Sequence, residues 1–499
     1  MAKAHVPAGP IRGRARTLAL AALLLATFLD LMYVTLLNVV LPSIEHDLSA
    51  SPSQLQWMLS GYTLALAVGI ISGARLGDLY GHKKVFLIGL LGFVAASAWC
   101  ALSPTADWLV IARVVQGVFA AAMLPQVLTQ IQVMYEPGER GGPIAAFSSL
   151  SGVAATVGPI LGPALMTWDL GGLGWRLVFW LNVPLGLACM WAAARYLPAS
   201  RVPDAPRLDP IGVALSAIGL FAILYPLIAV SDGSGWPAWV WASLAAGVVV
   251  LALFVWHQGR RSRAGKTPIL DVSLFRFRSV SAGLGVQLLF FVPVMGFFLV
   301  FMLFLQNGVG LAPLGAGLVM LPWSVLVAVF AAVSAVVLVP RIGRGAVQIG
   351  LVLLAVALVL VALTGSTFTG SVNWWLLMTG VVIGGAGMGM VVAPLAQLTL
   401  HDVPVSKAGS ASALFNSVTQ VAASLGVAVI GVVFFTQLAG GTNAIGTALA
   451  DSMWLGAGLL VVAFAATFAL PSRSATAPTP DAGSPPESTG AAGEVAHDG

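Results

Sequence analysis

The chain has 499 residues, of which 59% are hydrophobic and only 8% are charged. A soluble domain carries about 25% charged residues, and a water-soluble fold cannot bury so much apolar surface, so this composition predicts a protein whose solvent is mostly lipid. The net charge of +5 does not indicate nucleic-acid binding, because the basic residues fall in short segments between apolar runs.

Fourteen apolar runs follow one another along the chain, each close to the roughly 20 residues that a helix needs to cross a bilayer. They are too long and too continuously apolar to be strands of a membrane barrel, so helices are expected throughout. The first run also exceeds the roughly 7–15 apolar residues of a cleavable signal peptide. The predicted spans are 17–41, 56–76, 84–103, 107–130, 143–167, 175–197, 209–230, 236–256, 279–305, 313–339, 345–364, 373–397, 409–437 and 450–470.

The basic residues predict how these spans are oriented. If the spans alternate, every one of the 23 Lys and Arg residues except Arg113 and Arg176 falls on the side of the N-terminus. Cytoplasmic loops carry such an excess of Lys and Arg. We therefore expect a multi-pass protein with both termini in the cytoplasm. The opposite loops carry acidic residues instead, namely Glu45, Asp47, Asp107, Asp169, Asp232 and Asp451.

Two longer polar segments, 197–208 and 257–278, bracket a pair of spans and divide the chain into six helices, two helices and six helices. The predicted fold is an all-α integral membrane protein made of two six-helix bundles and two extra central helices. Its expected parts are a cytoplasmic N-terminus (1–16), the first bundle (17–197), an inserted pair (209–230 and 236–256) with basic cytoplasmic loops in 198–278, the second bundle (279–470) and a disordered, Pro- and Ser-rich cytoplasmic tail (471–499).

Asp30 is the only acidic residue well inside a predicted span, about 20 Å from the start of the first helix at ~1.5 Å per residue. A carboxylate at that depth costs a few kcal/mol on insertion scales, and such residues usually serve transport. Burial disfavours the charged form and a nearby cation favours it, so a carboxylate balanced between the two can take up and release a proton. A passive buried ion pair is the alternative interpretation.

Arg113, in the fourth span, cannot lose its proton and needs an anionic or carbonyl partner. Asp30 is the only acid available inside the membrane. Gln116 lies three residues further on and shares the face of Arg113. We expect Arg113 and Gln116 to form a polar patch that modulates proton binding at Asp30. Alternatively, Arg113 extends to the outer membrane interface.

The short loop ARLGDLYGHKK (74–84) joins the second and third spans. Asp78 stands among basic residues that include Arg75 and Lys83, and Gly81 permits a tight turn. A charge clasp of this kind can break and re-form as two bundles rock. A solvated turn that merely satisfies the topology rule is the alternative.

The fifth span contains SGVAATVGPILGP (151–163), where three glycines allow another helix to approach and prolines bend the axis. The residues of interest are Gly152, Gly158, Pro159 and Gly162. Gly158 and Gly162 share one face of an ideal helix, and we expect the bend to bring this segment against a helix of the other bundle. Ordinary helix packing is the alternative.

Polar side chains in other spans are candidates for a substrate cavity. Asn416 and Gln420 are four residues apart and so share a helix face. The candidate cavity residues are these two together with Asn38, Tyr62 and Gln116.

No cofactor or metal site is expected. Cys100 and Cys189 both fall in apolar runs and imply neither a disulfide framework nor a metal centre. The segment GRRSRAGKT (259–267) has five residues between its glycines, whereas a phosphate-binding loop has four. Without an ATP site, transport is expected to run on an ion gradient or downhill. No nucleophile elbow, His-rich metal motif or intramembrane carboxylate pair is found in the sequence, which argues against a membrane enzyme.

In this order, the motifs resemble the fourteen-span drug:proton antiporter family of the major facilitator superfamily, from Leu29 to Pro471. LDLMYVTLLNVVLPSIEHDL resembles the first-helix motif, with Asp30, Asn38 and Pro42 in register. The segments ARLGDLYGHKK, RVVQG, GPILGP, WRLVFWLNVPLG, GMGMVVAPL and AGSASALFNSVTQ are similar to further family segments. Ala74, Leu79, His82 and Pro163 depart from the family pattern.

The resemblance implies a non-enzymatic, monomeric exporter in a bacterial cytoplasmic membrane. It implies a proton-coupled antiporter that moves a small amphipathic drug, antibiotic or secondary metabolite by alternating access. The proton motive force would supply the energy, and the partners would be substrate, protons and the lipid bilayer. A lipid or lipid-intermediate flippase and a proton-coupled importer of the same fold are the alternatives. The fifth-span motif argues against import.

Overall fold

The computed structural model describes residues 13–168, 170–202, 208–233, 235–404, 407–438 and 444–470. Within these ranges the regular structure is entirely helical, as the sequence predicts. The expected cytoplasmic tail (471–499) and most of the expected N-terminal segment (1–16) lie outside the described residues.

The first bundle consists of six helices. They are α1 (Arg14–Leu48), α2 (Pro52–Tyr80), α3 (His82–Leu102), α4 (Ala106–Met134), α5 (Gly141–Trp168) and α6 (Arg176–Tyr196). Side-chain caps define several starts: Ser51 and Gln54 form a reciprocal capping box at α2, and Thr105 caps α4. Gly81 separates α2 from α3 with φ of 100°, a backbone conformation that residues with a side chain rarely adopt.

Two helices follow before the second bundle, α7 (Pro210–Val230) and α8 (Ala238–Arg263). The second bundle comprises α9 (Arg278–Leu303), α10 (Pro313–Val333), α12 (Arg344–Ser366), α13 (Trp374–Leu400), α14 (Ala408–Leu438) and α15 (Ala444–Ala466). A π-helical turn, η4 (Phe304–Gly308), extends α9. A second π-helical turn, η5 (Ser334–Leu338), joins α10 to the short α11 (Val339–Ile342).

Each of the fourteen predicted spans coincides with a helix, and thirteen helices of the described chain are long and apolar enough to cross a membrane. The remaining one, α5, has 28 residues. Within α5, the apolar helical stretch found among the described residues is the shorter Val157–Trp168. The total of fourteen membrane spans therefore stays a prediction.

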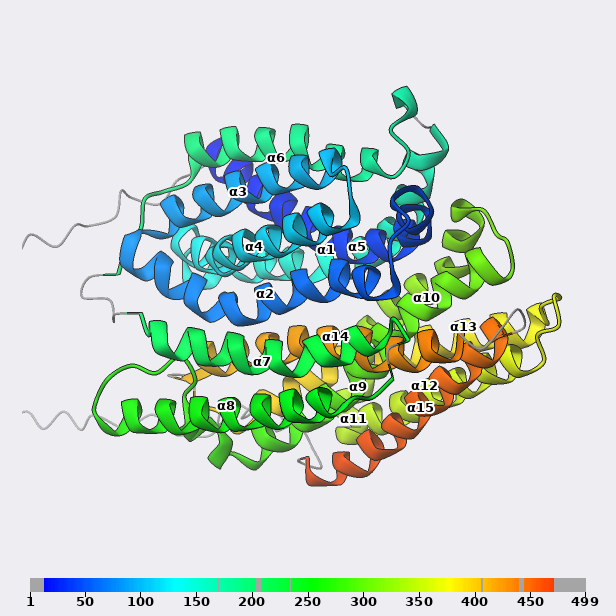
Figure 1. Cartoon of the computed structure of the whole chain (residues 1–499). Coiled ribbons are helices and arrows are strands. Elements are labelled where there is room, and N and C mark those ends of the chain that lie inside the picture. The colour runs from blue at the N-terminus through cyan, green and yellow to red at the C-terminus, as the bar shows by residue number, and fades with distance from the viewer. Residues whose placement is uncertain are drawn as a thin grey trace, which may run out of the picture.

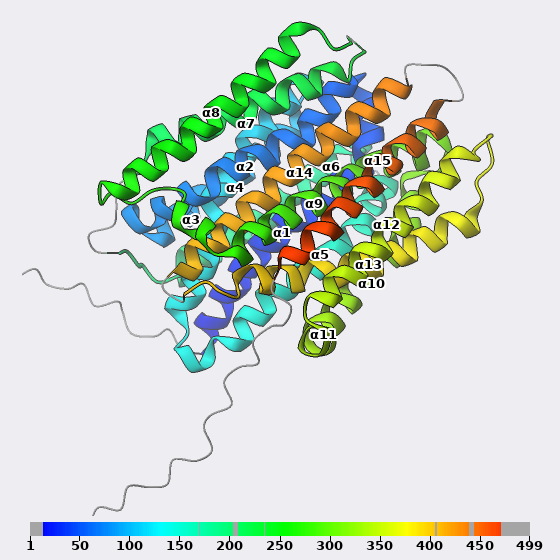
Figure 2. The same cartoon turned by 90° about the horizontal axis from the view of Figure 1, so that it is seen from below.

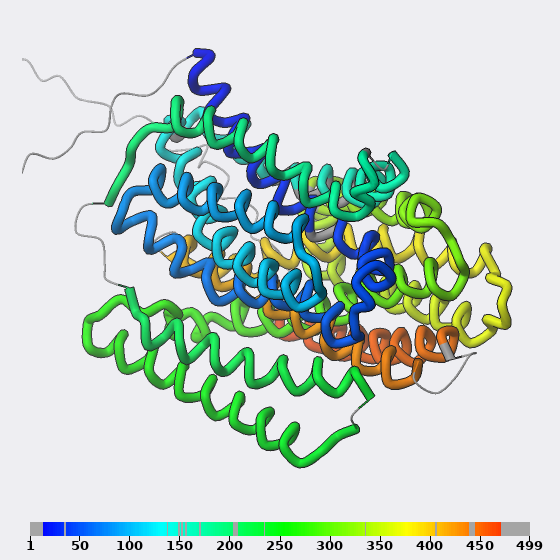
Figure 3. The backbone as a smooth tube through the Cα atoms, turned by 45° about the horizontal axis from the view of Figure 1, so that its top comes forward, coloured from blue at the N-terminus to red at the C-terminus, as the bar shows by residue number. Residues whose placement is uncertain are grey.

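The two bundles lie side by side, with the first bundle above the second in Figure 1. The inserted pair runs along one flank: α7 packs on α2 and α14, and α8 packs on α7 at the edge of the molecule (Figure 2). The same arrangement is visible in the tube view, where the green inserted pair lies outside both bundles (Figure 3). The inserted helices therefore cover a seam between the bundles without separating them.

The long helices run between two ends of the molecule. We call the end where α1 begins the first pole and the end where α1 ends the second pole. Contacts join the bundles in the half nearer the second pole. The Gln306 side chain donates to the Val39 carbonyl over 2.7 Å. Between α2 and α14, the Thr63 and Ser424 hydroxyls are 2.6 Å apart. The structure is therefore closed between the bundles at the second pole.

Candidate functional site

A buried polar cluster occupies the interior of the first bundle. Asp30 of α1 is 3% exposed, and Tyr62 of α2 is 1% exposed. The Tyr62 hydroxyl donates a hydrogen bond to the Asp30 carboxylate. The only acid that the sequence places deep in a span is thus held by a tyrosine of the next helix, a partner that sequence reasoning did not assign to it.

Arg113 of α4 lies on the other side of the Tyr62 ring. Its guanidinium carbon is 4.1 Å from the Tyr62 ring centroid and 5.0 Å from that of Tyr33. Its Nε donates to the Met58 carbonyl over 3.0 Å, and its Nη1 donates to the Gln116 side-chain oxygen over 2.5 Å. At 1% exposure, Arg113 does not extend to the membrane interface, so that alternative is wrong.

Arg113 and Asp30 are linked through the Tyr62 ring and not by a salt bridge in the described part of the chain. The hydrogen-bond partners of the arginine are carbonyl oxygens. The ring face attracts the guanidinium electrostatically, and the ring's hydroxyl meets the carboxylate. A change in charge at Asp30 therefore acts on Tyr62 through the hydrogen bond and on Arg113 through the electrostatic field.

The cluster continues away from Asp30 into α3 and α6. The Gln116 amide nitrogen donates to the Ser97 hydroxyl over 2.7 Å, and the Asn182 amide nitrogen approaches the same hydroxyl at 3.4 Å. The hydroxyl of Tyr33, beside Arg113, is buried and has no hydrogen-bond partner among the described residues. Ser97, Asn182 and Tyr33 were missed from the sequence, although each is a polar group inside an apolar span.

A small charge cluster lies at the first pole, where α2 ends and α3 begins. Asp78 lies 3.8 Å from Arg75 Nη1 and 3.6 Å from His82 Nε2. The other ring nitrogen of His82 is 2.8 Å from the Gln126 side chain of α4. Lys83 donates to the Ala194 carbonyl of α6 over 2.8 Å and takes no part in the cluster. His82, a departure from the family pattern, therefore links Asp78 to α4.

The fifth-helix motif packs on two different neighbours. A Cβ placed on Gly317 of α10 would lie 2.0 Å from the Pro159 carbonyl oxygen, so α5 meets the second bundle in close backbone contact. A Cβ placed on Gly162 would instead lie 2.9 Å from Leu36 of α1. Gly158 is buried, and of Gly152 the structure describes only its place in α5. The segment thus meets the other bundle at Pro159, whereas Gly162 accommodates α1 of its own bundle.

The predicted substrate-cavity residues do not converge on one cavity. Asn38 contributes, with Pro159, to a cavity of about 110 Å³ between the bundles. Tyr62 and Gln116 are enclosed in the polar cluster, and neither lines this cavity. Asn416 is exposed and donates to the Ser412 carbonyl one turn away, while Gln420 is partly buried on the same helix.

The remaining lining of that cavity is mostly apolar and contains four methionines. It comes from α1, α9, α10 and α13 and includes Val39, Met295, Phe298, Met302, Met320, Trp323, Ser324, Val327 and Met388. Methionine side chains adapt to irregular shapes and are frequent at surfaces that bind varied partners. Sequence reasoning missed these methionines because a methionine in an apolar span is usually core or lipid-facing.

In its described residues the molecule is helical, with two bundles, a buried polar cluster in one of them and a cavity between them, an architecture that fits a polytopic membrane transporter. The Major Facilitator Superfamily model matches residues 23–427. The chain therefore belongs to the Major Facilitator Superfamily, which confirms the resemblance found in its motifs.

Relatives by sequence cover most of the chain. A Streptomyces coelicolor protein named "Probable actinorhodin transporter" is 40% identical, over 86% of this chain and 74% of its own length. The "Tetracenomycin C resistance and export protein" of Streptomyces glaucescens is 33% identical, over 87% and 79%. The "Multidrug efflux pump LfrA" of Mycolicibacterium smegmatis is 31% identical, over 83% and 80%.

Solved structures agree on the fold at low sequence identity. A bacterial homologue of the human lysosomal transporter Spinster, in an inward-facing and unoccupied conformation, gives a TM-score of 0.63 at 18% identity and covers 92% of this chain and 98% of its own. The peptide transporter POT in complex with sulfate gives 0.62 at 16% identity and covers 91% and 95%. These likenesses concern the fold alone.

Proposed function

We propose that this transporter exports a small amphipathic drug, antibiotic or secondary metabolite across a bacterial cytoplasmic membrane in exchange for protons. Three relatives at 31–40% identity are named as a probable actinorhodin transporter, a tetracenomycin C resistance and export protein and a multidrug efflux pump. The distribution of Lys and Arg supports cytoplasmic termini, which makes the first pole cytoplasmic and the second pole external.

The observation that carries proton coupling is the placement of Asp30. It is a buried carboxyl group at mid-helix, and its partner is the Tyr62 hydroxyl, not a cation. A carboxyl group with a neutral partner can exist with or without its proton, whereas one locked to an arginine stays ionised. Proton uptake at Asp30 would change its bond to Tyr62 and relieve a charge that is costly inside the membrane.

Helix α2 would carry this change to the interface between the bundles. Tyr62 stands between Ser60 and Thr63, and both of these bond to Ser424 of α14. Helix α2 therefore carries both Tyr62, the partner of Asp30, and the residues that bond to Ser424 of α14. We call this α2–α14 contact the seam; it helps to hold the second pole closed. With the second pole external, these contacts close the external side of the molecule, and export would require this seam and the α5–α10 contact to open.

The test of export is a resistance screen in an efflux-deficient bacterial host. Cells that express the chain are exposed to a broad drug panel that includes actinorhodin, tetracenomycin C and puromycin. We expect higher inhibitory concentrations for a subset of the panel and loss of that protection in Asp30→Asn at equal membrane abundance. Protection that is absent for every compound, or a resistance pattern unchanged by Asp30→Asn, would contradict the proposal.

A further inference from the structure

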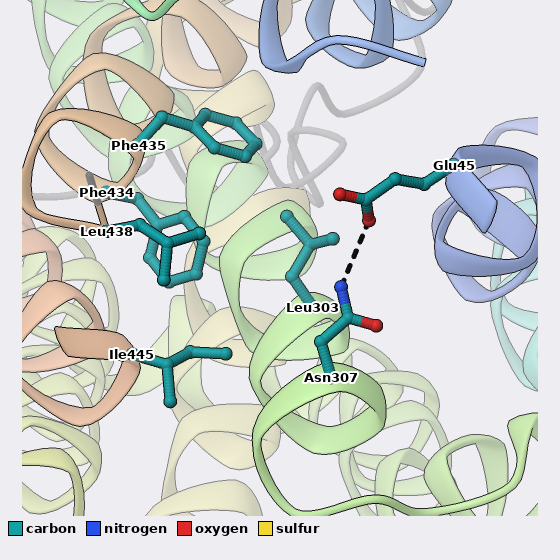
Figure 4. Close-up of a pocket in the computed structure, with 7 residues that line it drawn as sticks. All are labelled: Glu45, Leu303, Asn307, Phe434, Phe435, Leu438 and Ile445. Atoms are coloured by element: carbon teal, nitrogen blue, oxygen red, sulfur yellow. Dashed lines mark hydrogen bonds between the residues drawn. The ribbon is translucent and has the colours of Figure 1, made fainter. Parts of the chain in front are cut away.

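A second cavity, of about 260 Å³, opens between the bundles near the second pole. Five apolar side chains form most of its wall: Leu303 of α9, Phe434, Phe435 and Leu438 of α14, and Ile445 of α15. Glu45, near the end of α1, completes the lining from the first bundle, together with Asn307 of η4. Figure 4 shows the Glu45 carboxylate facing Asn307 on the side opposite the phenylalanines.

The Glu45 carboxylate has no cationic partner within salt-bridge distance in the described part of the chain. Its bond is with the Asn307 amide nitrogen, which donates to it over 3.0 Å. Burial raises the pKa of Glu45, and the hydrogen bond from Asn307 acts in the opposite direction. The carboxylate thus lies partly desolvated beside an apolar wall, and no cation of the described residues forms a salt bridge with it.

We propose that this cavity is a binding site for amphipathic organic cations, with Glu45 receiving the protonated amine and the wall of Phe434, Phe435 and Leu438 receiving the apolar part. A carboxylate favours a cation at close range, and aromatic rings add apolar area and attract positive charge. A cavity of about 260 Å³ lies just below the usual range for drug-sized ligands, about 300–1,000 Å³, so a small two-ring amine is the appropriate probe.

This site is distinct from the Asp30 cluster. Asp30 and its partners lie inside the first bundle, whereas the Glu45 cavity takes its walls from both bundles and lies at the closed pole. A cation bound here would bridge α1 and α14 while the second pole is shut. Binding at Glu45 can therefore be measured without any assumption about proton coupling or the direction of transport.

The charged groups around Glu45 are few. On α1, Asp47 forms a salt bridge with Arg176. His46 lies between Glu45 and Asp47 in the sequence. On α15, Asp451 is exposed, and the described residues of α14 include no titratable side chain. A pH dependence of cation binding should therefore follow Glu45: affinity is highest while the carboxylate is ionised and falls as the pH drops through its raised pKa.

The test uses a matched pair of probes, 1-naphthylmethylamine and 1-naphthylmethanol, which share the rings but differ in charge. Binding is measured by equilibrium dialysis with the full-length protein in phosphatidylcholine nanodiscs, and empty discs correct for partition into lipid. We expect the amine to bind about tenfold more tightly than the alcohol at neutral pH. In Glu45→Gln this preference should fall to within about twofold.

Two further variants keep the test decisive. Asp451→Asn removes an exposed carboxylate of α15, the helix that contributes Ile445 to the cavity, and should retain the preference for the amine. Leu438→Trp fills the cavity and should weaken both probes, because packed space tolerates little added volume. Equal binding of the two probes by the natural chain, a preference that survives Glu45→Gln, or probe binding unaffected by Leu438→Trp would each overturn the proposal.

Discussion

The tight contact between α5 and the second bundle at Gly317 can be tested with a single added methyl group. A Cβ on Gly317 would lie 2.0 Å from the Pro159 carbonyl oxygen, whereas ordinary contact begins at 3.4 Å. Gly317→Ala therefore requires the two helices to separate by about 1.4 Å, the difference of those distances. Overpacking of this kind costs about 1–3 kcal/mol.

Gly317→Ala raises the free energy of the closed state, in which α5 and α10 are in contact, relative to the open state. If the contact helps to close the second pole, a penalty of that size shifts the ratio of closed to open molecules about 5- to 150-fold toward the open state. The reporter is Asn38→Cys, in the cavity between the bundles, in a chain whose buried Cys100 and Cys189 are replaced by alanine. Its labelling by a membrane-impermeant maleimide is measured on intact cells.

We expect Gly317→Ala to raise the labelling rate severalfold. Gly285→Ala is the matched control, because a Cβ there meets nothing within 4 Å, and it should label like the parent. If Gly317→Ala labels at the parent rate while it is stably inserted, the α5–α10 contact is not part of the closure and the reasoning is refuted.

Three further substitutions test the cluster, the fifth helix and the seam. Arg113→Ala leaves the buried Gln116 oxygen without its donor, which lowers the free energy of unfolding by about 1–3 kcal/mol. We therefore expect a lower melting temperature and loss of export, and an unchanged melting curve would contradict the buried network. Gly158→Leu adds a bulky side chain to α5 and should push this helix away from its neighbours, abolish export and raise proton leak in substrate-free vesicles. Normal export without extra leak would show that α5 does not seal the pathway between the bundles. Ser424→Ala removes the 2.6 Å hydrogen bond to Thr63, which contributes about 0.5–1.5 kcal/mol to the α2–α14 contact. It should modestly raise labelling of the Asn38→Cys reporter from outside, and lower labelling would contradict a role of this contact in closing the second pole.

The helical architecture was predictable because lipid leaves little choice. A run of about 20 apolar residues must satisfy its own backbone, so each predicted span coincides with a helix. The ends were less predictable: α1 continues to Leu48, seven residues past the predicted end at Leu41. Hydropathy falls there, but the helix itself continues through Pro42 and carries Glu45 to the cavity between the bundles.

The candidate site was only partly predictable. Asp30 and Arg113 stand out in any reading, since ionisable residues inside spans are rare. The sequence could not show that the Tyr62 ring separates them, because this arrangement depends on how α1, α2 and α4 pack. Likewise, periodicity placed Gly158 and Gly162 on one face, but only the packing shows that Gly162 accommodates α1.

The central claim, exchange of substrate for protons through Asp30, is tested most directly by proton flux in proteoliposomes. The purified chain is reconstituted with a pH-sensitive dye inside, and a substrate identified in the resistance screen is added on one side. We predict that a substrate gradient drives proton movement in the opposite direction, and that Asp30→Asn abolishes this movement while the protein stays folded. Proton movement in Asp30→Asn equal to that of the natural chain, or substrate transport by the natural chain without any proton movement, would contradict the account.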